Sequence, residues 1–302
     1  MPASLQMDNV PVFKLNEKKL LSIYFFNVLL IACLIFLCSC QKEHQSSIIP
    51  IVFDSVPVTK ALNPLVNEIS GIADSKKNSG YLWGQEDSGN PSQLYLISHE
   101  GTVVKKIYLA GITNRDWEDM ALFNGDIYIA ETGDNSQTYG SYKFYKFPEP
   151  SATADTVTNI ETINFTYPDG SHDAEAFLID ATSKNIYIIT KRDFPSKIYR
   201  LNYPYTANNT VTLVGALPYT GVVSAASSGN EIIIKTYTNL YYYTRLPNES
   251  IEQTLQKSFT SLTYVMEPQG EAISFATNNT GFYTLSEKAS ASSVNLFFYK
   301  RK

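Results

Sequence analysis

The sequence predicts an all-β protein that folds as a single β-propeller, and three observations support this prediction. A unit of short strands recurs about every fifty residues, which is the scale of a four-stranded blade. Aromatic residues, chiefly Tyr and Phe, make up 13% of the chain, and both types favour strands. No strong helical periodicity follows the N-terminal segment. A sandwich of two sheets is the alternative fold.

Each repeat opens with a short strand that carries an acidic residue, followed by a strand with an Ile/Leu-Tyr core. The openings are residues 67–72, 116–121, 173–177, 222–226 and 270–274. The fourth opening has the same spacing but lacks the acid. Five openings predict five blades, and six is the alternative if a further blade lies within residues 134–172. The last repeat is one strand short, so we expect the N-terminal segment Ile48–Thr59 to close the ring.

The N-terminal segment is predicted to be an export signal with a lipid anchor. Lys18 and Lys19 precede an uncharged apolar run, which is typical of a signal peptide or membrane anchor. The run ends at Leu37-Cys38-Ser39-Cys40, which resembles a bacterial lipobox and implies lipidation of Cys40. The predicted organisation is a signal peptide over 1–39, a lipidated cysteine and tether over 40–50, and a propeller over 51–302. A plain anchor helix is the alternative.

The residues after the lipobox indicate where the protein resides. Gln41-Lys42-Glu43 resembles the signal that sends Bacteroidetes lipoproteins to the outer face of the outer membrane, whereas a periplasm-facing lipoprotein is expected without it. The net charge of −5 argues against a nucleic acid as partner. The three cysteines of the chain lie at 33, 38 and 40, so no disulfide framework is expected.

Several motifs resemble known propeller proteins. The segment Gly125–Asn135 resembles the second strand of an NHL-type blade, and the acid-bearing openings look like those of phytase-like esterases and gluconolactonases. Most of 60–290 is similar to uncharacterised Bacteroidetes-type propeller lipoproteins that carry "DWED", "PEP", "YPDGSHDAEA" and "GEA". This resemblance implies the fold and no particular activity.

The repeat places a ring of carboxylates at one mouth of the central channel. Because neighbouring strands are antiparallel, first-strand starts and second-strand ends meet at the same mouth. Both sets of positions carry acids, which are the candidate ligand or metal residues. They are Glu68, Glu118, Asp119, Glu131, Asp134, Glu175 and Glu271. The same rule also brings Glu86, Asp87, Asn135, Asp173 and Glu287 to this mouth.

Carboxylates gathered in such a ring repel one another, and this repulsion can be relieved in several ways. It could hold a hard divalent cation, most simply Ca²⁺, or contain protonated carboxylates with raised pKa values. It could also pair with Lys191, Arg192 and Lys235, which we expect to face anions at the mouth. Acids that only hydrogen-bond the neighbouring blades are a fourth possibility. Trp83 and Trp117 flank acidic mouth residues, where they would either contact a sugar or pack between blades.

Three functions are compatible with these residues. The preferred one is a non-enzymatic lipoprotein whose mouth binds a divalent cation or a small polar ligand such as a glycan. A Ca²⁺-dependent hydrolase of phosphoesters or lactones is the first alternative, with His172 or Asp119 as base. A protein-interaction platform is the second. The sequence contains no Walker loop, GxSxG elbow or HExxH motif. The oligomeric state and the identity of the ligand are not predicted.

Overall fold

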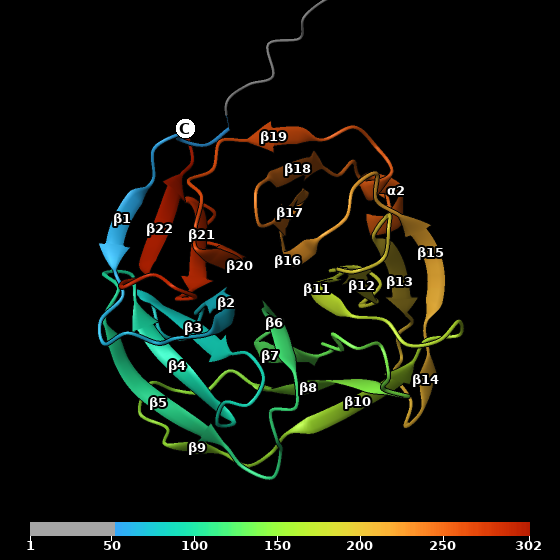
Figure 1. Cartoon of the computed structure of the whole chain (residues 1–302), viewed down its shortest axis with the longest axis horizontal. Coiled ribbons are helices and arrows are strands. Elements are labelled where there is room, and N and C mark those ends of the chain that lie inside the picture. The colour runs from blue at the N-terminus through green and yellow to red at the C-terminus, as the bar shows by residue number, and fades with distance from the viewer. Residues whose placement is uncertain (1–51) are drawn as a thin grey trace, which may run out of the picture. The chain divides into compact units, whose positions relative to one another are not determined.

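The computed structural model describes residues 52–302, which form five β-sheets around a central axis (Figure 1). The lipobox, Cys40 and the segment 41–43 lie outside the described residues. Within 52–302 there is no helix of the length and apolar character needed to cross a membrane.

Each sheet is one propeller blade whose strands follow one another from the axis outward. Blade 1 consists of β2 (Ile69–Asp74), β3 (Tyr81–Glu86), β4 (Gln93–Ser98) and β5 (Val103–Leu109). Blade 2 consists of β6 (Trp117–Phe123), β7 (Asp126–Glu131), β8 (Tyr142–Pro148) and β10 (Glu161–Thr166). Blade 3 consists of β11 (Ala174–Ile179), β12 (Ile186–Thr190), β13 (Lys197–Leu201) and β15 (Thr212–Ala216). Blade 4 consists of β16 (Val222–Ser228), β17 (Glu231–Thr236), β18 (Leu240–Thr244) and β19 (Thr260–Leu262), with the short helix α2 (Ile251–Leu255) before β19. Blade 5 consists of β20 (Gln269–Phe275), β21 (Gly281–Glu287), β22 (Asn295–Lys300) and β1 (Val58–Ala61).

The five-bladed propeller predicted from the repeats is confirmed, and the six-bladed and sandwich alternatives are wrong. The region 134–172 contains β8 and β10 of blade 2, together with β9 (Thr156–Val157), which pairs in parallel with the edge of blade 1. Its length therefore adds edge strands rather than a blade. A second short strand, β14 (Asn209–Thr210), covers the edge of blade 2 in the same way. Both additions pair backbone groups at sheet edges that would otherwise be open.

The last blade takes its outer strand from the N-terminal side of the described chain. β1 pairs antiparallel with β22, so Val58 lies opposite Phe298 and Ala61 lies opposite Asn295. Of the expected segment 48–59, only Val58 and Thr59 belong to this strand, and Phe53 forms an isolated bridge with Arg301. The pairing joins the two ends of residues 52–302 in a single sheet.

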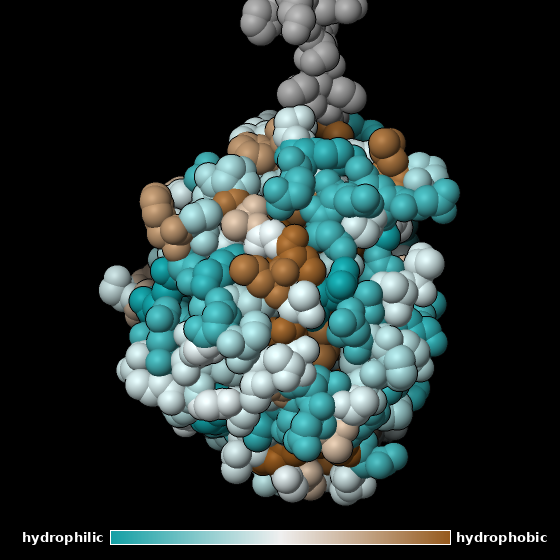
Figure 2. Space-filling model, turned by 90° about the vertical axis from the view of Figure 1, so that its right-hand side faces the viewer, coloured by the Kyte–Doolittle hydropathy of each residue, from teal (hydrophilic) through white to brown (hydrophobic). Residues whose placement is uncertain are grey.

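The core lies between blades, because apolar side chains from both faces of each sheet pack against the neighbouring sheets. In β12 all five residues are buried, as expected for a strand covered on both sides. Clusters of buried residues join each pair of adjacent blades, and they contain most of the buried Tyr and Phe. The side of the ring that Figure 2 shows is hydrophilic over much of its surface, with a hydrophobic patch near its centre. The aromatic excess therefore serves packing between blades.

Candidate functional site

All five innermost strands contain a bulge near the same mouth of the channel. In each blade the register between first and second strand shifts there, at Ile69/Gly71, Trp117/Met120, Ala174/Ala176, Val222/Ser224 and Gln269/Ala272. A bulge inserts a residue that has no partner on the next strand and re-aims its side chain. The inserted residues include Glu118, Glu175 and Glu271. The local backbone therefore brings three glutamates together at this mouth.

The bulges also correct the predicted alignment of the repeats. The residue equivalent to Glu118 is Ser70 in blade 1, where the repeat had indicated Glu68, and Val223 in blade 4. Glu68 lies two residues earlier, is exposed at the rim, and accepts a hydrogen bond from Asn90 Nδ2 at 2.6 Å. It is therefore a rim residue and not an equal member of the ring.

Glu118 lies at the centre of the acidic cluster. One oxygen each from Glu118, Asp87 and Asp116 lie within 4.8 Å of one another, and the same holds for Glu118, Asp173 and Glu175. Glu118 is only 4% exposed, and its carboxylate forms no hydrogen bond or ion pair with any residue of 52–302. Glu118 is thus a carboxyl group shared by two carboxylate triads. Beside it, Glu175 Oε2 is buried and forms no hydrogen bond with the described residues.

The backbone around Glu118 is shaped to fit its side chain. Gly133 lies against the carboxylates of Glu118 and Asp116, so a Cβ at this position would collide with both. A larger residue in place of Gly133 would therefore have to displace these carboxylates from their positions in the cluster.

Two cations border the cluster on its open side. Lys191 Nζ contacts Glu175 Oε1, lies 3.6 Å from Glu271 Oε1, and donates to Tyr237 Oη at 3.0 Å. Arg192 Nε lies 2.7 Å from Asp173 Oδ2, and the Arg192 side chain is 44% exposed. Lys191 and Arg192 line a pocket of 380 Å³. Asp87 and Glu175 of the carboxylate cluster, together with Glu271, line the same pocket. We call this pocket, with the cluster beneath it, the acidic mouth.

Burial raises the pKa values of the carboxylates in the acidic mouth. Removal from water is the main cause, and repulsion from neighbouring acids adds to it, so the pKa values of Glu118 and Glu175 lie well above their ordinary values, although Lys191 partly offsets the rise at Glu175. The same causes raise the pKa of Asp87 to about 7 and that of Glu287, beside Glu271, to about 9. The site therefore holds protons at neutral pH that a divalent cation would displace.

Two predicted ligand residues are held by protein donors instead. Glu131 accepts from Trp117 Nε1 at 3.2 Å and lies 3.5 Å from Lys143 Nζ. Asp134 accepts from two backbone amides, those of Thr138 at 2.9 Å and of Tyr139 at 2.8 Å. Partial burial opposes these bonds, but together they lower the pKa of Asp134. The structure therefore places Glu131 and Asp134 in supporting positions beside the mouth.

The prediction that Lys235 faces an anion at the mouth is wrong. Its side chain is fully buried between blades 4 and 5, where Nζ lies 2.7 Å from Glu267 Oε2 and 2.6 Å from Tyr264 Oη. Lys191 and Arg192, in contrast, line the pocket as expected.

The two candidate bases do not reach the pocket. Asp119 is fully buried and accepts hydrogen bonds from Ser224 Oγ at 3.0 Å and from Met120 N at 2.9 Å. His172 is 5% exposed, with Nδ1 2.9 Å from Asp193 Oδ2 and Nε2 3.1 Å from Asp169 Oδ1. Both side chains are held by neighbours, and neither lines the pocket.

The tryptophans pack between blades and offer no sugar platform. Trp83 and Trp117 are fully buried, and their indole nitrogens donate to Glu149 at 3.0 Å and to Glu131 at 3.2 Å. The Pro148-Glu149-Pro150 segment thereby receives a physical role, because its glutamate accepts the hydrogen bond of the Trp83 indole in the neighbouring blade.

Two residues of the site were missed by the sequence reasoning. Asp116 precedes β6 and joins the first carboxylate triad. Tyr237 follows the end of β17 directly and donates to Glu271 Oε1 in the pocket. The rule that second-strand ends reach the mouth, extended by one residue past Thr236, would have found Tyr237.

No known protein family and no curated protein matches the sequence. Among solved structures, two similar chains are the following. The chain is similar to Kuenenia stuttgartiensis hydrazine synthase, with a TM-score of 0.42 and 8% identity over 76% of this chain and 70% of that one. It is also similar to an auxiliary nutrient binding protein from Bacteroides thetaiotaomicron, with a TM-score of 0.46 and 10% identity over 82% and 73% of the two chains.

Proposed function

We propose that this protein is a binding protein whose acidic mouth holds a divalent cation, Ca²⁺, and presents it to a small polar ligand. The observation that carries the proposal is the pair of carboxylate triads that meet at Glu118, together with Glu175 Oε2, which is buried without a hydrogen bond among the described residues. Ionised carboxylates are costly to bury side by side, and a cation at this point would displace their protons and offset that cost.

The donor set fits Ca²⁺ better than a transition metal. Calcium prefers six to eight oxygen ligands, whereas zinc prefers histidine and cysteine. The two triads supply carboxylate oxygens alone, from Glu118, Asp87, Asp116, Asp173 and Glu175. Water and a ligand would complete the coordination from the pocket side.

The open side of the site supports a polar ligand. Arg192 uses Nε on Asp173 and leaves part of its exposed guanidinium facing the pocket. Tyr237 and Gln269 add further polar groups to the same wall. A glycan fragment or another ligand rich in hydroxyl or anionic oxygens would therefore meet both the cation and these side chains.

Binding is favoured over hydrolysis because the two candidate bases are unavailable. Asp119 is occupied by donors from blade 4, and both ring nitrogens of His172 face carboxylates. We propose that the propeller acts in the cell envelope, tethered through a lipidated Cys40. A Cys40→Ala protein that still incorporates a palmitate label would contradict this tether.

The cation site is tested by calorimetry and thermal melting of metal-free protein with Ca²⁺ and Mg²⁺. At one hundred times its Kd, Ca²⁺ should add about 2.7 kcal/mol to the free energy of unfolding. We expect Glu118→Gln to weaken Ca²⁺ binding by at least about tenfold, because it removes a carboxylate ligand that both triads share. The matched control is Glu100→Gln, whose side chain is 73% exposed outside the acidic mouth and should leave affinity unchanged. Saturable Ca²⁺ binding that survives Glu118→Gln unaltered would refute the proposal.

A further inference from the structure

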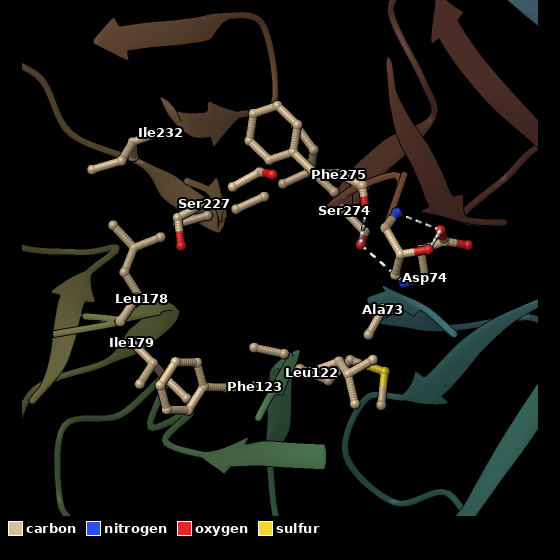
Figure 3. A pocket seen from close by; sticks show the side chains of 18 of the residues that line it. Ala73, Asp74, Leu122, Phe123, Leu178, Ile179, Ser227, Ile232, Ser274 and Phe275 are labelled. Atoms are coloured by element: carbon tan, nitrogen blue, oxygen red, sulfur yellow. Dashed lines mark hydrogen bonds between the residues drawn. The ribbon is translucent and has the colours of Figure 1, made fainter. Parts of the chain in front are cut away.

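The opposite end of the channel contains a second pocket of 330 Å³. All five innermost strands contribute their C-terminal residues to it, so its wall is built from the same strands that begin at the acidic mouth. Figure 3 shows Phe123, Leu178 and Phe275 around an open centre, on β6, β11 and β20 respectively. We call this space the apolar pocket.

A buried layer separates the apolar pocket from the acidic mouth. Asp119 on β6 accepts hydrogen bonds from Ser224 Oγ at 3.0 Å and Ala225 N at 3.3 Å, both on β16. These strands belong to blades 2 and 4, which are not neighbours in the ring, so the bonds cross the channel. The two pockets share no lining residue, and a ligand in one would not contact a ligand in the other.

The shape of the apolar pocket comes from residue size along the strand ends. Ala73, Ala121 and Ala226 stand where larger side chains would fill the space, while Leu122 and Phe123 remain half-buried at its edge. The volume lies at the lower end of the range for small-molecule sites, which are mostly apolar with a few polar groups.

Of the charged side chains that line the apolar pocket, Asp74 and Arg245 are paired, whereas Lys76 has no ion pair among the described residues. Asp74 accepts from Thr277 N at 2.7 Å and Thr277 Oγ1 at 2.9 Å, and lies 2.7 Å from His99 Nε2. Arg245 is paired with Asp180 at 2.5 Å. Lys76, which also lines the pocket, is exposed and forms no ion pair with any residue between 52 and 302.

We propose that the apolar pocket binds an amphipathic monoanion, with its alkyl or aryl part among the strand ends and its anionic group at Lys76. Apolar contact with the walls supplies most of the binding free energy. Lys76 selects the charge, because the acid that lines the pocket is already satisfied by its own donors. Ser227, whose hydroxyl has no hydrogen bond within the described chain, offers a second polar contact at the pocket.

The test uses the full propeller domain and three probes with the same chain length: decanoate, decylammonium and decanol. We expect decanoate to bind at one site per chain and more tightly than the other two in titration calorimetry. Ser227→Trp should weaken decanoate binding at least about tenfold by filling the pocket. Ser290→Trp, in an exposed turn after β21, is the matched control and should bind decanoate as the parent does. Circular dichroism and melting confirm that both variants are folded.

A second pair of variants tests the charge. Lys76→Gln should weaken decanoate about fivefold and leave decanol unchanged, as expected for an exposed ion pair. Lys300→Gln, exposed and outside the pocket, should change neither. Absence of saturable decanoate binding, or undiminished binding to Ser227→Trp, would overturn the site. Equal affinity for the three probes, or an unchanged affinity in Lys76→Gln, would overturn the proposed preference for an anion.

Discussion

The two ends of the channel are formed by the same five strands and yet differ in chemistry. At the acidic mouth each strand begins with a bulge, and three of the inserted residues are glutamates. At the other end the strands pair regularly, and all but β2, which ends at Asp74, finish in small or apolar residues. A regular strand sends successive side chains to opposite faces, whereas a bulge breaks that alternation. The difference shows that local irregularity, and not blade number, decides which end concentrates charge.

The largest effect should come from breaking the layer that separates the ends. Asp119→Ala would leave Ser224 Oγ and the amides of Met120 and Ala225 without their acceptor in a buried site. We expect a loss of about 3–4 kcal/mol in the free energy of unfolding, measured by urea denaturation. Asp155→Ala, with its side chain 89% exposed, is the control and should cost about 0.5 kcal/mol or less. A loss in Asp119→Ala as small as in this control would show that the ends are not joined through Asp119.

The pH dependence of stability should arise at the acidic end. Burial raises the pKa of Glu287 from 4.5 to about 9 and that of Asp87 from 3.8 to about 7. The folded state therefore retains protons that the unfolded chain has already released, and stability falls as pH rises from about 4.5 to 9. In the presence of a chelator we expect the free energy of unfolding to fall by an amount on the order of 2–3 kcal/mol over this pH range. Denaturation experiments at each pH measure this loss.

Saturating Ca²⁺ should reduce this loss, because the cation replaces the displaced protons. A metal-free protein whose stability rises steadily between pH 5 and 9 would contradict the predicted sign.

Removing a cation from the acidic mouth should affect stability and Ca²⁺ affinity in opposite directions. Lys191→Met deletes the ammonium group that contacts Glu175 and lies 3.6 Å from Glu271. We expect about 1–2 kcal/mol lower stability in chelator and several-fold tighter Ca²⁺ binding, since the carboxylates become freer. Lys143→Met, beside Glu131 and outside the pocket, is the control and should leave Ca²⁺ affinity as it is. Weaker Ca²⁺ binding in Lys191→Met would count against a cation site.

The smallest effect should come from the rim. Glu68→Gln changes an exposed side chain that the repeat alone would have ranked with Glu118. We expect the free energy of unfolding, measured by melting, to change by less than about 0.5 kcal/mol. The Ca²⁺ affinity, measured by calorimetry, should stay within about twofold of that of the parent. A loss as large as in Glu118→Gln would restore Glu68 to the ring and refute the alignment through Ser70.

Much of the fold followed from patterns that act locally. The repeat spacing predicted five blades, and the Ile/Leu-Tyr cores marked their second strands. The antiparallel rule correctly brought Glu118, Glu175, Glu271 and Lys191 to one mouth. It failed for Glu68, because the bulge shifts the blade 1 register to Ser70. It failed for Lys235 because Glu267, thirty-two residues along the chain, holds its side chain between blades.

By itself the sequence determined the propeller, the count of five blades and the end at which carboxylates gather. These follow from strand alternation and from a repeat in which each unit cannot bury its faces alone. Only the tertiary structure decided that Glu118 lies in two carboxylate triads while Glu131, Asp134 and Asp119 are held by hydrogen-bond donors. Ser224 and Ala225, which donate to Asp119, lie in blade 4, across the channel from blade 2. The apolar pocket at the other end is likewise lined by residues from all five blades. Contacts between residues so far apart in the chain form only when the ring closes.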